Sequence, residues 1–145
     1  MPTRTARTAW NGTLETGSGQ VELSSSKVGT YEGSFPKRAA DEAGGTTSPE
    51  ELIAAAHSSC FAMQLSADVA AAGGTPQSLE VTADVSLGPD PAGGFRLTGI
   101  ALKVVGEVEG LDEAGFVKAA EAAKAGCPVS KVLAGAEITM NARLA

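Results

Sequence analysis

The sequence predicts an α+β fold with the element order βββ-α-ββ-α-β. Three observations carry this prediction. Several short segments alternate apolar and polar residues, one long helix has a well-marked start, and a second helix precedes the last strand. Because most strands follow one another directly, we expect hairpins in an antiparallel sheet, with the long helix central against it. A chain of 145 residues without a linker predicts one domain, residues 1–145.

The first third of the chain predicts a β meander. Asn11-Gly12 is a two-residue hairpin signal between the first two strands. The second strand, near residues 20–24, alternates apolar and polar residues, and a third strand is expected at residues 29–33. Residues 37–47 are polar and contain glycine, so we expect a loop there.

The long helix is predicted to run from Pro49 to about Ala72. Ser48 is the expected N-cap, proline stands at the first helical position, and Glu51 completes a capping box. Gly73-Gly74 ends the helix. Alanine and serine occupy most of its other positions, so we expect its surface to be largely covered. The expected apolar stripe comprises Leu52, Ile53, Ala56, Cys60, Met63 and Ala67.

Five further elements follow along the chain: strands at residues 79–87, 95–105 and 136–144, a helix at 113–125, and a short helix at 128–134. The apolar parity of the second of these strands switches near Gly99, which predicts a β-bulge. Asp112 is the expected cap of the helix at 113–125. Its inward residues are predicted to be Phe116, Val117 and Ala120.

Composition excludes several functional classes. The formal net charge is −6 with no basic cluster, which argues against nucleic acid as a partner. No segment is long and apolar enough for a membrane span, and no signal peptide is evident, so we expect a cytoplasmic protein. The chain is 43% hydrophobic but only 4% aromatic, so alanine supplies much of the apolar count. This pattern favours closely packed small-residue helices or a partner subunit.

The two cysteines are the main candidates for chemistry. Cys60 lies on the long helix and Cys127 lies 67 residues later. In a reducing compartment a structural disulfide is not expected, so the two are either buried small side chains or a redox pair. Cys127 stands where one helix ends and another begins, and nearby backbone N–H groups should lower its pKa. Burial should raise the pKa of Cys60, which then needs a nearby cation to react.

Other candidates leave alternatives open. His57 precedes Cys60 by three residues and could act as a base, or it could be an ordinary packed or hydrogen-bonded histidine. A zinc site of His57, Cys60 and Cys127 is conceivable, but no CxxC or HxxxH spacing supports it. Arg38 lies in the expected loop, where an arginine is usually solvated unless the loop folds over a thiol. Lys37 is the other cation of that segment.

The segment 47–63, TSPEELIAAAHSSCFAM, closely resembles the central-helix signature of the OsmC/Ohr family of organic hydroperoxide peroxidases. The segment 125–133, AGCPVSKVL, resembles the second cysteine motif of that family. Weaker matches at residues 10–12, 82–87 and 136–139 extend the resemblance over nearly the whole chain. The spellings of the two motifs look like the OsmC branch rather than the Ohr branch.

The resemblance implies an intertwined homodimer with two active sites at the interface. It implies a thiol peroxidase acting on organic hydroperoxides, with Cys60 as the peroxidatic and Cys127 as the resolving cysteine. Glu50 matches the acidic partner of the catalytic arginine, and Arg38 is our match for that arginine. The implied reductant is a dithiol or a lipoylated protein, with no metal, haem or flavin cofactor.

One expectation comes from helix geometry. Glu50 and Cys60 are ten residues apart on one helix, about 15 Å along its axis, which a glutamate side chain cannot bridge. If both serve one active site, Glu50 should come from the partner subunit. The alternative to a peroxidase is a non-enzymatic dimer of this fold that binds a small apolar ligand and has structural cysteines.

Overall fold

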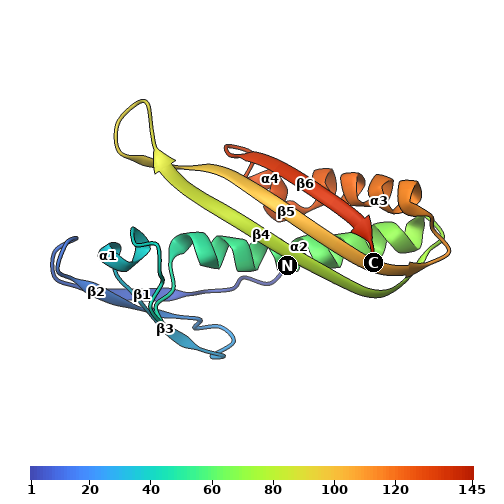
Figure 1. The fold of residues 1–145 in the computed structure, drawn as a ribbon. Coiled ribbons are helices and arrows are strands. Elements are labelled where there is room, and N and C mark those ends of the chain that lie inside the picture. Colours follow the sequence, from blue (N-terminus) through green and yellow to red (C-terminus); the bar gives the residue numbers. More distant parts are fainter. The chain divides into compact units, whose positions relative to one another are not determined.

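A computed structural model describes residues 1–145 (Figure 1). The chain divides into two compact units, residues 1–52 and residues 53–145. Each unit has a three-stranded sheet, so the α+β class is confirmed. The assignment of residues 1–145 to one domain stays a prediction.

The sheet of the first unit is antiparallel. It consists of β1 (Arg7–Asn11), β2 (Ser18–Glu22) and β3 (Thr30–Gly33), in the order β1-β2-β3. The first hairpin is confirmed, but its two-residue loop is wrong, because Asn11 pairs with Ser18 and residues 12–17 form the turn. Gly12 adopts a φ of +93°, and Gly17 N donates to the Thr13 carbonyl at 2.8 Å. This internal hydrogen bond closes the longer turn.

A short helix, α1 (Phe35–Arg38), replaces the start of the expected loop. Ser34 is its N-cap, and the Ser34 side chain accepts a hydrogen bond from Lys37 N. Proline in the first turn suits a helix start because its missing N–H is not needed there. The remainder of the predicted loop, residues 39–47, contains no helix or strand.

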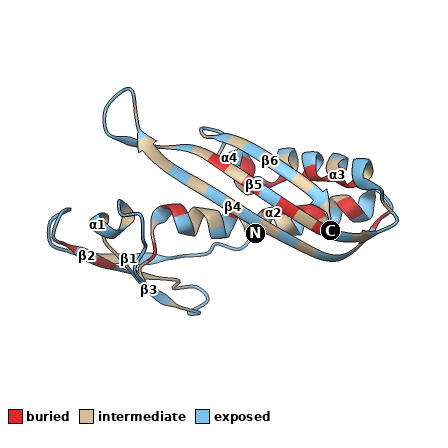
Figure 2. Cartoon of the chain, viewed as in Figure 1, coloured by how far each residue is buried: buried red, intermediate tan, exposed pale blue.

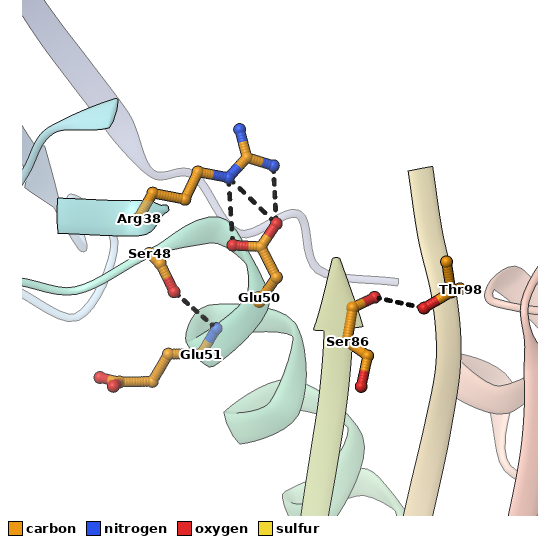
Figure 3. A network of polar contacts seen from close by, with 6 residues as sticks. All are labelled: Arg38, Ser48, Glu50, Glu51, Ser86 and Thr98. Carbon is orange, nitrogen blue, oxygen red and sulfur yellow. Dashed lines mark hydrogen bonds and ion pairs between the residues drawn. The ribbon is translucent and has the colours of Figure 1, made fainter. Parts of the chain in front are cut away.

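The long helix is confirmed as α2 (Pro49–Ala71). Ser48 Oγ accepts a hydrogen bond from Glu51 N at 3.1 Å, as the capping box predicts (Figure 3). The predicted apolar stripe is not the face of α2 that packs into the core of the second unit. Met63 is 72% exposed, and the buried stripe is instead His57, Phe61, Leu65 and Val69. Apolar residues occur around the whole helix, and the core takes the face with the bulkier side chains. Neither α2 nor any other helix has the length and apolarity to cross a membrane.

The sheet of the second unit is mixed rather than wholly antiparallel. β4 (Thr75–Pro89) and β5 (Phe95–Glu109) form a long antiparallel hairpin, but β6 (Glu137–Leu144) runs parallel to β5. Two helices connect β5 to β6, and such a crossover is what parallel neighbours require. The bulge predicted at Gly99 is confirmed. Ser86 pairs with Gly99 and Leu87 pairs with Leu97, which leaves Thr98 unpaired, and its Oγ1 donates to the Ser86 carbonyl at 3.4 Å (Figure 3).

The crossover consists of α3 (Glu113–Gly126) and α4 (Pro128–Val132). Asp112 caps α3 as predicted, and its carboxylate accepts from Gly115 N at 2.8 Å. The core of the unit lies between the sheet and the helices, where the buried positions of α2, α3 and β5 gather (Figure 2). It comprises Phe61, Leu65 and Val69 of α2, Ile100, Leu102 and Val104 of β5, Phe116, Ala119, Ala120 and Ala123 of α3, and Cys127. Cys127 therefore joins α3 to α4 at the core.

Candidate active site

The second unit brings the two cysteines together. Both thiols are free, and a hydrogen bond joins the Sγ atoms of Cys60 and Cys127, which lie 3.0 Å apart. A disulfide has an S–S length of about 2.05 Å, so a shift of about 1 Å would allow this bond to form. Cys127 is 0% exposed, whereas Cys60 is partly accessible. Of the two cysteines, Cys60 is therefore the one that a solute can reach.

The two thiols ionise as a pair, with opposite tendencies. Burial raises the pKa of the Cys60 thiol, and the hydrogen bond with Cys127 raises it further. Burial also acts to raise the pKa of Cys127. The hydrogen bond with Cys60 and the backbone and hydroxyl of Ser130 outweigh burial and lower it, with a smaller contribution from the backbone of Val129. The lowered pKa expected for Cys127 at the α3–α4 junction is thus found, and so is the raised pKa expected for Cys60.

His57 contacts a serine rather than a thiol. Its Nε2 lies 2.7 Å from Ser130 Oγ, and both side chains are buried. Its Nδ1 is buried without a hydrogen-bond partner, and burial lowers the pKa of the imidazole. Ser130 was not a candidate from the sequence. The available signal was its place three residues after Cys127, on the first turn of a helix that begins at that cysteine.

The first unit brings Arg38 and Glu50 together (Figure 3). Arg38 Nε donates to both carboxylate oxygens of Glu50 at 3.1 Å, and Nη2 donates to Oε1 at 2.6 Å. Burial acts to raise the pKa of Glu50, but hydrogen bonds and the positive charge of Arg38 lower it overall. The cation that the structure pairs with Glu50 is therefore Arg38 rather than Lys37. The roles of the two residues in catalysis stay predictions.

An apolar cavity of about 290 Å³ lies in the first unit. Arg38 contributes to its lining, together with the apolar side chains of Trp10, Leu14, Val21, Phe35 and Leu52. The guanidinium group thus borders a space that suits a hydrocarbon group. No group of three or more His, Cys, Asp and Glu side chains is placed to hold a metal ion.

Comparisons with known proteins identify the family of this chain. The family model for the OsmC-like proteins matches residues 42–142. The peroxiredoxin OsmC of Escherichia coli strain K12 is 46% identical over 135 residues, which are 93% of this chain and 92% of that protein.

Solved structures show the same fold. An organic hydroperoxide resistance protein from Elizabethkingia anophelis superposes with a TM-score of 0.79 at 26% identity, covering 100% of this chain and 98% of the other. The organic hydroperoxide resistance protein OhrB of Bacillus subtilis gives a TM-score of 0.76, also at 26% identity, with coverages of 96% and 98%. The match to the family model and the identity over nearly the whole chain show that this protein belongs to the OsmC family.

Proposed function

We propose that this chain reduces organic hydroperoxides to alcohols through a Cys60 sulfenic acid and a Cys60–Cys127 disulfide. Its 46% sequence identity to a curated peroxiredoxin makes it a peroxide-reducing enzyme, an oxidoreductase of the peroxidase class. The reaction steps and the substrate class are our proposal. The observation that carries the proposal is the distance of 3.0 Å between the sulfur atoms of a partly exposed cysteine and a buried one. Two free thiols placed in this way can be oxidised in sequence within one chain.

The first step oxidises Cys60. Its thiolate attacks the terminal oxygen of the hydroperoxide, an S–O bond forms, and the O–O bond breaks. The alkoxide leaves and takes up a proton to become the alcohol, while Cys60 becomes a sulfenic acid. The thiolate of Cys127 then attacks Cys60 Sγ, and the S–O bond breaks as the S–S bond forms. The departing hydroxide takes up a proton and leaves as water.

The cycle closes when an external dithiol or a lipoylated protein reduces the disulfide by thiol–disulfide exchange. The exchange converts the reductant to its disulfide and returns both cysteines to thiols. The proposed cycle uses no metal, haem or flavin cofactor.

The thiolate of Cys60 requires a cation, and we infer that a partner subunit supplies it as the Arg38–Glu50 pair. Ten helical residues separate Glu50 from Cys60 on α2, about 15 Å along the axis. A homodimer with antiparallel α2 helices would place the ion pair of one protomer at the thiol of the other. The exposed α2 face that includes Ala56, Met63 and Ala67 supports such an interface, because these small or flexible apolar side chains allow close helix packing.

The cavity of the first unit supports an organic substrate. Arg38 can hydrogen-bond the peroxide oxygens while the apolar lining contacts the hydrocarbon group. The related proteins of Elizabethkingia anophelis and Bacillus subtilis carry organic hydroperoxide resistance in their names, which also supports this class. Phe61, the residue after Cys60, lies in the core of the second unit and does not line this cavity.

The substrate class is tested by the ratio of the second-order rate constants for cumene hydroperoxide and hydrogen peroxide. We expect a ratio well above one, which falls several-fold in Leu14→Ser, because Leu14 lines the cavity and is half-exposed. Val28→Ser is the matched control, since Val28 is exposed in the same unit outside the cavity lining. A ratio near one in the unaltered protein would contradict the proposed substrate class.

A second candidate is a non-enzymatic dimer that binds a small apolar ligand and has structural cysteines. The raised pKa of Cys60 is the direction that this alternative predicts. The 46% identity to a peroxiredoxin argues against it. The two candidate functions differ in one measurable property, which is whether the thiols of the assembled protein react with a hydroperoxide.

A further inference from the structure

A chain of buried polar contacts leads away from the cysteine pair. Ser130 Oγ lies 2.7 Å from His57 Nε2, and Ser130 follows Cys127 by three residues on the first turn of α4, where side chains at this spacing lie on one face. Cys127 in turn lies 3.0 Å from Cys60. The proposed cycle does not use the first two residues, although both are buried and both lie three residues from a cysteine in sequence.

His57 is a costly residue for a core. Its Nδ1 has no partner, and an apolar side chain of similar size would leave no polar atom unsatisfied there. The helix stripe that it begins continues with Phe61, Leu65 and Val69, all apolar. Since a buried polar group with one unmet hydrogen bond costs stability, its other nitrogen should have a function.

The tautomer follows from the orphaned nitrogen. A proton on Nδ1 would bury an N–H donor without an acceptor, so the neutral ring with its proton on Nε2 is favoured. That proton is donated to Ser130 Oγ. The Ser130 hydroxyl proton is then free to point at Cys127 Sγ, in agreement with the lowering effect of this hydroxyl on the Cys127 pKa.

We propose that His57 is a positioning residue for the resolving step, and that it acts through Ser130 to hold Cys127 as the attacking thiolate. This inference rests on the proposed function. The chain of donors runs from His57 Nε2–H to Ser130 Oγ–H to Cys127 Sγ. Cys127 gives its own proton to solvent and then attacks the Cys60 sulfenic acid. The S–S bond forms, the S–O bond breaks, and the hydroxide leaves as water with a proton from solvent.

Few other titratable or charged groups face Cys127. Cys60 and His57 reach it from α2, the latter through Ser130. On β5, Lys103 alternates with buried Leu102 and Val104 and therefore lies on the opposite face of the sheet, where it pairs with Asp84 of β4.

Three charged side chains share a cleft with Ser130. Lys124 and Glu121 of α3 and Lys131 of α4 line, with Ser130, an open cleft of about 400 Å³ in the second unit. Because solvent enters this cleft, it screens the effect of these charges on Cys127. The buried side chains of His57 and Ser130 are screened less.

The test separates the two oxidation steps. Reduced protein is mixed with one equivalent of cumene hydroperoxide at pH values between 5 and 9. Samples taken over time are treated with dimedone, which labels the remaining sulfenic acid, and their intact mass is measured. The masses follow the conversion of the sulfenic acid to the disulfide. Ser130→Ala and His57→Leu remove the two donors. Ser130→Thr and His57→Gln restore a hydroxyl and an N–H donor. Ser78→Ala, at an exposed serine of β4, is the matched control.

We expect both donor-removing variants to raise the pH midpoint of disulfide formation by about one unit, with a rate about tenfold lower below the midpoint. The two restoring variants and the control should stay within about threefold of the unaltered protein. An unmoved midpoint in His57→Leu, or slowing that is equal at every pH, would overturn the assignment of His57. Absence of the disulfide in the unaltered protein would instead overturn the proposed function.

Discussion

Cys127 Sγ lies 3.0 Å from Cys60 Sγ, although 67 residues separate the two along the chain. The long helix α2 presents one sulfur atom, and the junction of α3 and α4 presents the other. Only Cys60 is partly exposed, and this difference supports the proposed order, in which Cys60 reacts first and Cys127 second.

Removal of the buried thiol should stop the cycle after its first step. In Cys127→Ser the sulfenic acid of Cys60 has no thiol to attack it, so it should accumulate and bind dimedone in nearly every chain. Peroxide turnover with a dithiol reductant should fall at least tenfold. Intact mass after dimedone treatment measures the adduct. An adduct no larger than that of the unaltered protein would contradict the assignment of Cys127 as the resolving cysteine.

Loss of the guanidinium group should slow the oxidation of Cys60. An adjacent cation lowers a thiol pKa by about one to three units, so Arg38→Met should reduce the rate at pH 7 about tenfold or more. The rate should recover at higher pH, because the remaining thiol still ionises there. Stopped-flow rates from pH 5 to pH 10 check this. Arg96→Met, at an exposed arginine of β5, is the control, and a profile unchanged from it would contradict the role of Arg38.

Glu50→Gln should lower stability in a manner that depends on pH. The pKa of Glu50 is lowered in the fold, so its ion pair stabilises the protein above the unfolded value and is lost as pH falls through the folded value. At pH 7 we expect a loss of roughly 1–3 kcal/mol in the free energy of unfolding. The difference should shrink toward zero as the pH falls through the lowered pKa of Glu50. Urea unfolding at pH 7 and at a pH below this pKa measures it.

The control for this variant is Glu15→Gln, at an exposed glutamate in the first hairpin turn. Its effect should be below about 0.5 kcal/mol at either pH. An equal loss for Glu50→Gln at both pH values would show that the carboxylate charge is not what stabilises the pair.

Gly106 of β5 should not tolerate a side chain. A Cβ atom there would lie 2.6 Å from Phe116 Cζ, inside a core where neither the ring nor the strand can shift cheaply. Gly106→Ala should cost about 1–3 kcal/mol in the free energy of unfolding. Gly135→Ala is the control, because nothing lies within 4 Å of its Cβ position. Equal stability of the two variants would contradict the packing of α3 on β5.

Local signals predicted much of the fold. The capping box at Ser48 and the cap at Asp112 placed both long helices, and the parity switch near Gly99 placed the bulge. These features depend on neighbouring residues. The parallel pairing of β6 with β5 could not be predicted in this way, because it depends on how a crossover returns to the sheet. The helix α1 has only four residues. Ser34 and Pro36 favour a helix start there, but the polar residues around them favoured a loop more strongly.

The site was predictable to a lesser extent. The two cysteines were candidates by their residue type, and family resemblance added Arg38 and Glu50. Apart from the helical spacing of Glu50 and Cys60, nothing in the sequence indicates a distance between these residues. The contact of His57 with Ser130 joins residues 73 positions apart and had no sequence signal beyond their places beside the two cysteines. The buried face of α2 was misjudged because alanine makes several faces equally apolar, and only packing against β5 and α3 selects one.

We expect Cys60 and Cys127 to form a disulfide when the protein reduces a hydroperoxide. The most direct measurement adds one equivalent of cumene hydroperoxide to the reduced protein, then counts free thiols and takes an intact mass. The expected result is the loss of both thiols in each chain and a mass lower by about two daltons. Two unreacted thiols in each chain would contradict it and would leave a resemblance of fold without the activity.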